Sequence, residues 1–211
     1  MAWFSRFTRF GDVHAVYGQE LDNSCIIASA IMCVFKINKL RPDVSSLKTT
    51  QDVISKYKKI EGNKAHDFAV SGGDPKLIAR VLNTMNCGTW KGDWVSAKDV
   101  SKIVHEKVGL TKGIGPSVDV SPVIAGVGWS GGGGHAVVID TVRSWDDKLY
   151  ATVCDPWDAD VHITGFDPAT AFSYEPKKSM FSHNFWGETK GDKSPFGPTD
   201  SGSGIAIVYR T

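Results

Sequence analysis

The feature that most constrains the fold is an apolar segment that starts at Cys25. From Cys25 to Phe35 the chain reads Cys-Ile-Ile-Ala-Ser-Ala-Ile-Met-Cys-Val-Phe. Wound as an α-helix, this segment is apolar around nearly its whole circumference, so it has to be covered on all sides. Asn23 and Ser24, just before it, are residue types that cap helix N-termini. The sequence therefore predicts a central, buried helix that begins at Cys25.

The chain changes character near Gly115-Pro116. Before this point, caps and apolar spacing predict further helices over 51–59, 75–83 and 97–108, behind Thr50, Asp74-Pro75 and the Ser96/Asp99 capping box. After it, short segments rich in valine and isoleucine predict strands over 118–127, 136–142, 149–153, 161–164 and 205–209. A short helix is expected at Asp167-Pro168, and a surface loop over 190–204. We therefore expect one α+β domain over 1–211, with a helical lobe (about 17–114) and an antiparallel sheet lobe (about 115–211).

Charge and cysteine content narrow the classes of function. Lysine plus arginine number 24 and aspartate plus glutamate 23, so no long-range field gathers nucleic acid. No signal peptide and no membrane span is expected, which predicts a soluble chain that is cytoplasmic or exported by a leaderless route. The four cysteines are expected to be reduced, and the scattered histidines predict neither a metal site nor a cofactor. Cys33 and Cys154 lie in apolar runs and are expected to be structural.

Cys25 combines a nucleophilic side chain with a favourable position. Thiols attack as thiolates, and the free N–H groups at a helix N-terminus stabilise that anion. Gln19, six residues earlier and outside the helix, could direct its amide and the Cys25 N–H at one oxyanion. Because any cysteine has a fair chance of a glutamine nearby, this segment alone favours a structural cysteine.

The second half adds a base and an acid. His135 follows four glycines and opens the strand Ala136 to Ile139, so its imidazole is expected at the rim of the sheet. Asp155 ends the next predicted strand, and antiparallel pairing would bring it beside His135. An acceptor there fixes the tautomer of the imidazole and stabilises its cation. Taken singly, Asp155-Pro156 is better interpreted as a turn; the combination predicts a triad.

These residues together resemble a known family. The blocks Gln19-x5-Cys25-Ile-Ile-Ala, Ser121-Pro-Val-Ile-Ala, Gly134-His-Ala-Val-Val-Ile and Asp155-Pro-Trp are similar to the pattern of papain-like cysteine peptidases, nearest to the bacterial branch with C39-type and AvrRpt2-like enzymes. The resemblance implies Cys25 as nucleophile, His135 as base, Asp155 as orienting acid and Gln19 as oxyanion donor. It also implies a substrate cleft between a helical lobe and a sheet lobe. Ile26 and Ile27 depart from the family pattern after the cysteine.

Four further residues are candidates for substrate binding. Gly72 and Gly73 precede a predicted helix and are more simply a helix-entry turn, although papain relatives use a glycine pair as a substrate platform. Gly134 adjoins His135. Trp157 would shield the bond between Asp155 and His135 from water, and packing between the lobes is its alternative role.

Two other motifs are rejected. Residues 126–131 match the dinucleotide pattern GxGxxG, and residues 128–132 match the serine nucleophile elbow GxSxG around Ser130. Both motifs must lead into a helix, whereas a strand follows here. His162 and His183 have no nameable partner and are expected to face solvent.

The leading hypothesis is therefore a cysteine protease that acts on a protein or peptide, as a bacterial effector, toxin or processing enzyme. An immunity or inhibitor protein bound across the cleft would be its natural regulator. Two alternatives stay open: a thiol amidase or deamidase acting on side-chain amides or peptidoglycan, and a papain-fold binding domain without turnover.

Overall fold

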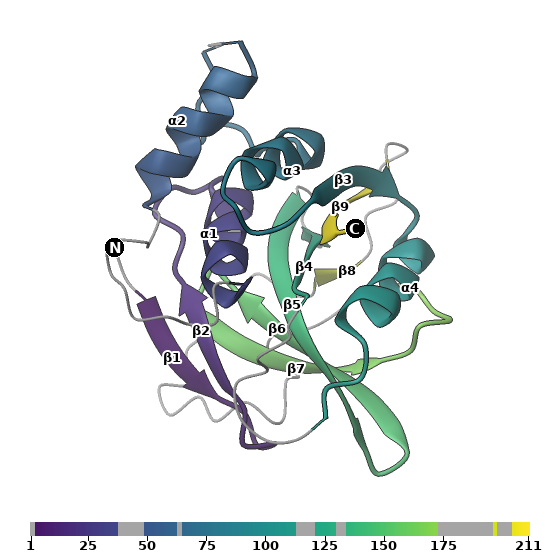
Figure 1. Cartoon of the computed structure of the whole chain (residues 1–211). Coiled ribbons are helices and arrows are strands. Elements are labelled where there is room, and N and C mark those ends of the chain that lie inside the picture. The colour runs from purple at the N-terminus through teal and green to yellow at the C-terminus, as the bar shows by residue number, and fades with distance from the viewer. Residues whose placement is uncertain are drawn as a thin grey trace.

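The computed structural model describes residues 3–37, 49–62, 65–112, 121–129, 134–172, 196–197 and 204–211 (Figure 1). The helices are α1 (Cys25–Ile37), α2 (Thr50–Ile60), α3 (Pro75–Asn83) and α4 (Ala97–Val108). The strands are β1 (Trp3–Phe7), β2 (Val13–Tyr17), β3 (Trp90–Val95), β4 (Val123–Trp129), β5 (Gly134–Trp145), β6 (Lys148–Asp155), β7 (Asp160–Phe166), β8 (Phe196–Gly197) and β9 (Ile205–Arg210). The α+β class expected from the sequence is confirmed.

Local signals set the starts of three helices. Thr49 and Asp52 form a reciprocal capping box on α2, the Asp74 side chain accepts from Lys76 N–H ahead of α3, and Ser96 caps α4. α1 differs, because the Ser24 hydroxyl bonds to the backbone of Leu21 and closes the preceding turn. The helix boundaries agree with the sequence to within one residue, but the cap of α2 is Thr49 and not Thr50, and the Ser24 hydroxyl does not cap α1.

The main sheet is antiparallel, in the order β3-β9-β4-β5-β6-β7, with the short β8 paired to β4. A separate hairpin pairs β1 with β2. The sequence did not predict β1, β2 or β3. Because β3 pairs with β9, the segment 17–114 contributes a strand to the main sheet in addition to its helices.

Helices cover both faces of the sheet. α1, α2 and α3 form one hydrophobic cluster with side chains from one face, and α4 forms a second cluster with side chains from the other (Figure 1). Neighbouring residues of β5 alternate between the clusters: Val138 belongs to the first and Val137 to the second. α1 is nearly surrounded by the first cluster, as its apolar circumference requires.

The segment after β7 departs from expectation. Residues 168–169 form a turn, not a helix, because the Asp167 carboxylate accepts from Ala169 N–H while its carbonyl accepts from Thr170 N–H. Most of the loop expected over 190–204 lies outside the described residues. None of the described helices has the length and hydropathy needed to cross a bilayer.

Candidate active site

Cys25 occupies the first turn of α1. The first intrahelical bond runs from Ala28 N–H to the Ser24 carbonyl (2.9 Å), so the N–H groups of residues 25–27 lie ahead of it and point out of the helix end. The Cys25 side chain is 8% exposed and is hydrogen-bonded to His135. The Cys25 thiol and the free backbone N–H groups of residues 25–27 therefore lie together at the N-terminus of α1.

His135 and Asp155 meet at the rim of the sheet. His135 is the second residue of β5 and Asp155 the last of β6, and the two strands pair antiparallel with Val138 opposite Cys154. His135 Nε2 lies 2.7 Å from Asp155 Oδ1. The side chains are only 5% and 1% exposed. The juxtaposition expected from neighbouring strands is present.

The histidine bridges the acid and the thiol. Nε2 faces Asp155, which leaves Nδ1 as the ring atom for Cys25. One turn along α1, the Ser29 hydroxyl donates to the Ala136 carbonyl (3.3 Å), beside His135. Because residues i and i+4 share a helix face, this bond aligns Cys25 with the strand that carries His135.

Opposing effects set the charge of His135. Burial alone lowers the pKa of the imidazole, but the Asp155 carboxylate and the Cys25 side chain raise the pKa of His135 to about 10. The ring is therefore a cation through neutral pH, and it loses its charge as the pH rises through about 10. A protonated imidazole between a carboxylate and a sulfur can stabilise a thiolate and later release a proton.

Gln19 reaches the site through its backbone but directs its amide elsewhere. Its N–H donates to the Pro156 carbonyl (2.8 Å), just after Asp155. Its side-chain Nε2 donates to the Leu21 and Asp22 carbonyls, each at 3.0 Å. Both amide hydrogens thus have acceptors in the loop before α1. Gln19 is thus bonded to the residue after Asp155 and to the loop before α1, and its role as oxyanion donor stays a prediction.

The remaining predicted residues separate into structural and open positions. Trp157, half-buried, donates its N–H to Asp155 Oδ1 (2.8 Å), which places its backbone in support of the acid. A Cβ on Gly73 would lie 2.7 Å from Ile26 Cγ2, so Gly73 serves close packing beneath the residue after Cys25. A Cβ on Gly72 or Gly134 would meet nothing within 4 Å, so both remain open to a ligand.

A buried polar cluster lies between α1 and the sheet. Asp140 Oδ2 is 2.6 Å from Lys36 Nζ and 2.9 Å from His14 Nδ1, and Lys36 Nζ is 3.6 Å from Cys154 Sγ. All four residues are buried. Burial and the neighbouring Asp140 raise the pKa of Cys154 above its ordinary value, so its thiol stays protonated. Cys154 is internal, as expected, but in a charged setting that the sequence did not suggest.

A second histidine lies behind Asp155. His162 is 2% exposed, and its Nε2 is 2.9 Å from Asp158 Oδ2, so the expectation that it faces solvent is wrong. The two residues are four positions apart along the chain, and the turn into β7 brings them together. One side-chain oxygen or nitrogen atom from each of Asp155, Asp158 and His162 lies within 4.8 Å of the others. The same holds for one side-chain atom from each of His14, Asp140 and Cys154. Ser130 and His183 lie outside the described residues.

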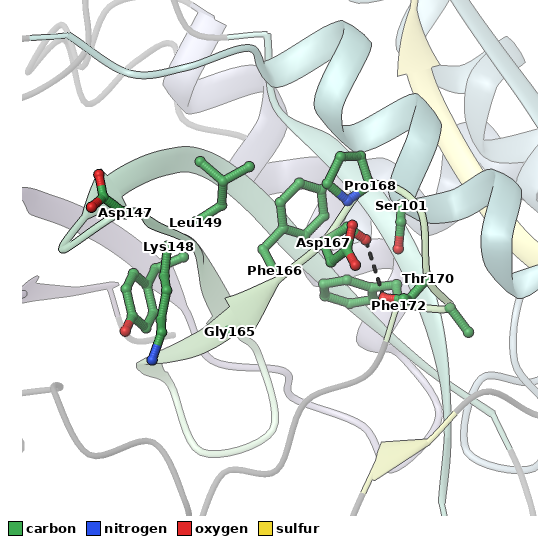
Figure 2. A pocket seen from close by; sticks show the side chains of 12 residues that line it. Ser101, Asp147, Lys148, Leu149, Gly165, Phe166, Asp167, Pro168, Thr170 and Phe172 are labelled. Carbon is green, nitrogen blue, oxygen red and sulfur yellow. Dashed lines mark hydrogen bonds between the residues drawn. The ribbon is translucent and has the colours of Figure 1, made fainter.

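The structure also has a pocket of about 490 Å³ that is separate from these residues. It is bounded by β6, β7, the segment after β7, and Ser101 of α4 (Figure 2). Phe166, Phe172 and Pro168 supply apolar walls, and the Thr170 hydroxyl donates to the Asp167 carbonyl at its edge. None of the predicted site residues lines this pocket.

Comparison with models of known protein families finds no match to this chain, and a search of curated proteins finds none either.

Proposed function

We propose that the chain is a papain-like cysteine peptidase that hydrolyses peptide bonds through Cys25, His135 and Asp155. The observation that carries the proposal is the arrangement of His135, which holds Asp155 at 2.7 Å through Nε2 and hydrogen-bonds to a cysteine at a helix N-terminus. A buried cysteine with a structural role needs neither the imidazolium nor the carboxylate behind it. The sequence resemblance supports the papain-like assignment of the helical and sheet elements.

In the proposed mechanism, the Cys25 thiolate attacks the scissile carbonyl carbon, and the carbonyl π electrons move to oxygen. Two donors would stabilise the oxyanion: the backbone N–H of Cys25 and one side-chain N–H of Gln19, after that N–H has left its carbonyl acceptor in the loop before α1. His135 Nδ1 donates its proton to the leaving amine as the C–N bond breaks, which leaves a thioester on Cys25. Neutral His135 then takes a proton from water as the water oxygen attacks the thioester carbon. The C–S bond breaks, the carboxylic acid product is released, and Cys25 leaves as a thiolate beside protonated His135.

The test compares the alkylation rates of the four cysteines, which are all buried and all free thiols. Folded protein is treated with iodoacetamide or an epoxide inhibitor of cysteine peptidases at pH 7, and the modified peptides are identified by mass. Cys25 should react at least about 100 times faster than Cys33, Cys87 or Cys154, because Cys25 is hydrogen-bonded to the His135 imidazolium whereas burial raises the pKa of each of the other three thiols. Equal labelling of Cys87 and Cys25 would sink the proposal.

Substrate class is tested with the same protein. Hydrolysis of an unstructured protein such as casein, abolished by Cys25→Ala, supports peptide-bond cleavage. Release of ammonia from protein glutamine, or cleavage of muropeptides, would instead assign an amidase. Labelled Cys25 with no turnover on any of these substrates would indicate a binding domain.

A further inference from the structure

The turn that follows Asp155 is braced by charged side chains. Asp155 and Asp160 are paired across it, at the end of β6 and the start of β7. Both carboxylate oxygens of Asp158 are used: Oδ1 accepts from Asp160 N–H (3.1 Å) and Oδ2 binds His162 Nε2 (2.9 Å). At the β7 end of the turn, Arg6 Nε of β1 lies 3.2 Å from Asp160 Oδ1.

The same turn touches the candidate site at two points. Asp155 Oδ1 accepts from His135 Nε2 and from Trp157 N–H, and the Pro156 carbonyl accepts from Gln19 N–H. A shift of this turn would therefore move the acid and Gln19 together.

Backbone geometry indicates that the turn is held by its surroundings. Ala159 has φ +56°, in the left-handed region that alanine rarely adopts. Such a conformation costs about 1 kcal/mol or more and persists only where neighbouring contacts impose it. The Asp158 bonds flank this residue on both sides.

Acidic and basic side chains face one another in this group. The carboxyl groups of Asp155, Asp158 and Asp160 lie against the basic side chains of His135, His162 and Arg6, respectively. Burial alone lowers the pKa of His162, but Asp158, then Asp155 and Asp160, raise it. His162 is thus favoured as a cation that keeps Asp158 in place.

We propose that Asp158 and His162 are positioning residues, which act through the turn 156–159 to hold Asp155 against His135 and Pro156 against Gln19. The proposal rests on the function proposed above for Cys25, His135 and Asp155. It assigns roles to two residues that touch no reacting atom.

The test compares His162→Gln and Asp158→Asn with wild type, using His105→Gln on α4 as a matched histidine control. NMR titration of the imidazole gives the pKa of His135, and iodoacetamide gives the alkylation rate of Cys25 at pH 6. Positioning predicts that both variants lower the pKa of His135 by about one unit, because Asp155 is released, and slow alkylation by about tenfold. His105→Gln should change neither quantity.

A purely electrostatic role predicts a different pattern. Removing the His162 cation would raise the pKa of His135, whereas neutralising Asp158 would lower it. Shifts of opposite sign, or no shift in either variant, would overturn the positioning role. If His162→Gln does not fold by circular dichroism, Arg6→Gln loosens the other end of the turn and should also lower the pKa. If Cys25 of the wild-type protein is not labelled selectively, the proposed function is refuted, and this inference with it. If wild-type Cys25 is labelled selectively but neither variant changes the pKa of His135 or the alkylation rate of Cys25, this inference alone is refuted.

Discussion

At the scale of single residues, His135 shows how neighbours overcome burial. Water exclusion disfavours an imidazolium, yet the carboxylate of Asp155 and the side chain of Cys25 bring the pKa of His135 to about 10 from an ordinary 6.5. Because the folded pKa is raised, the stability that this pair contributes is complete below pH 6.5. It is lost as the pH rises through about 10.

Asp155→Asn tests this account. Without the carboxylate, burial dominates, so the pKa of His135 should fall well below 10 and Cys25 alkylation at pH 6 should slow by about 10 to 100 times. Imidazole NMR titration and mass spectrometry of the Cys25 peptide measure the two effects. Asp147→Asn, an exposed site in the β5–β6 turn, is the control. If His135 still titrated near 10 in Asp155→Asn, the carboxylate would not be the cause.

Gly72 and Gly73 form a matched pair for packing. Gly73→Ala places a methyl group 2.7 Å from Ile26 Cγ2 and 3.2 Å from Phe68 Cε1, and should destabilise the fold by about 1–3 kcal/mol. Gly72→Ala meets nothing within 4 Å and should change stability by less than about 0.5 kcal/mol. Urea unfolding measures both. Equal effects would contradict the close packing of Gly73 beneath α1.

At the scale of elements, α1 is attached to the sheet at both ends. Its N-terminal half contacts β5 through the bond from Ser29 to Ala136, and its last turn contributes Lys36 to Asp140. Burial alone would lower the pKa of Lys36 and raise that of Asp140. The Asp140 carboxylate reverses the shift in the pKa of Lys36, and His14, followed by Lys36, reverses the shift in the pKa of Asp140. The buried charges therefore fix how the helix lies on the sheet.

Lys36→Met should cost about 3 kcal/mol of unfolding free energy at pH 7, because it leaves Asp140 without its ammonium partner in a buried place. The double variant Lys36→Met/Asp140→Asn should recover part of that loss. Lys102→Met, on the exposed face of α4, is the matched control. Urea denaturation measures the unfolding free energy of the three variants. Equal unfolding free energies of Lys36→Met and Lys102→Met would contradict a stabilising buried ion pair.

At the scale of the molecule, one sheet belongs to two hydrophobic clusters. β4, β5 and β6 supply side chains to the cluster around α1 and, from alternate positions, to the cluster under α4. If these strands separate in one cluster, buried side chains of the other cluster become exposed as well. Unfolding of the described parts should therefore be cooperative.

Val137 and Val138 test this coupling, because they are fully buried neighbours in opposite clusters. Each change to alanine should lower the unfolding free energy by about 2 kcal/mol. In both variants, tryptophan fluorescence and circular dichroism should give coincident urea transitions. A transition that splits in one variant but not the other would show that the clusters unfold separately.

Local chemistry made much of the fold predictable. Caps and spacing placed α2, α3 and α4, and the apolar circumference of the segment from Cys25 predicted its burial, because these signals act within one or two turns. Valine-rich runs located most of the main sheet. The adjacency of His135 and Asp155 followed from two strands that are neighbours in sequence and in space.

Contacts between distant segments decided the rest. Lys36 and Asp140 are 104 residues apart, and nothing near Lys36 marks it as internal. β3 was not predicted because its pairing partner, β9, is at the other end of the chain. The burial of His162 and its contact with Asp158 depend on a turn whose conformation is set by both flanking strands. The sequence by itself determined the helices and most strands of the main sheet, and it predicted the candidate nucleophile, base and acid; tertiary packing decided the charge of His135 and which residues surround Asp155, since burial and long-range pairing exist only in the folded chain.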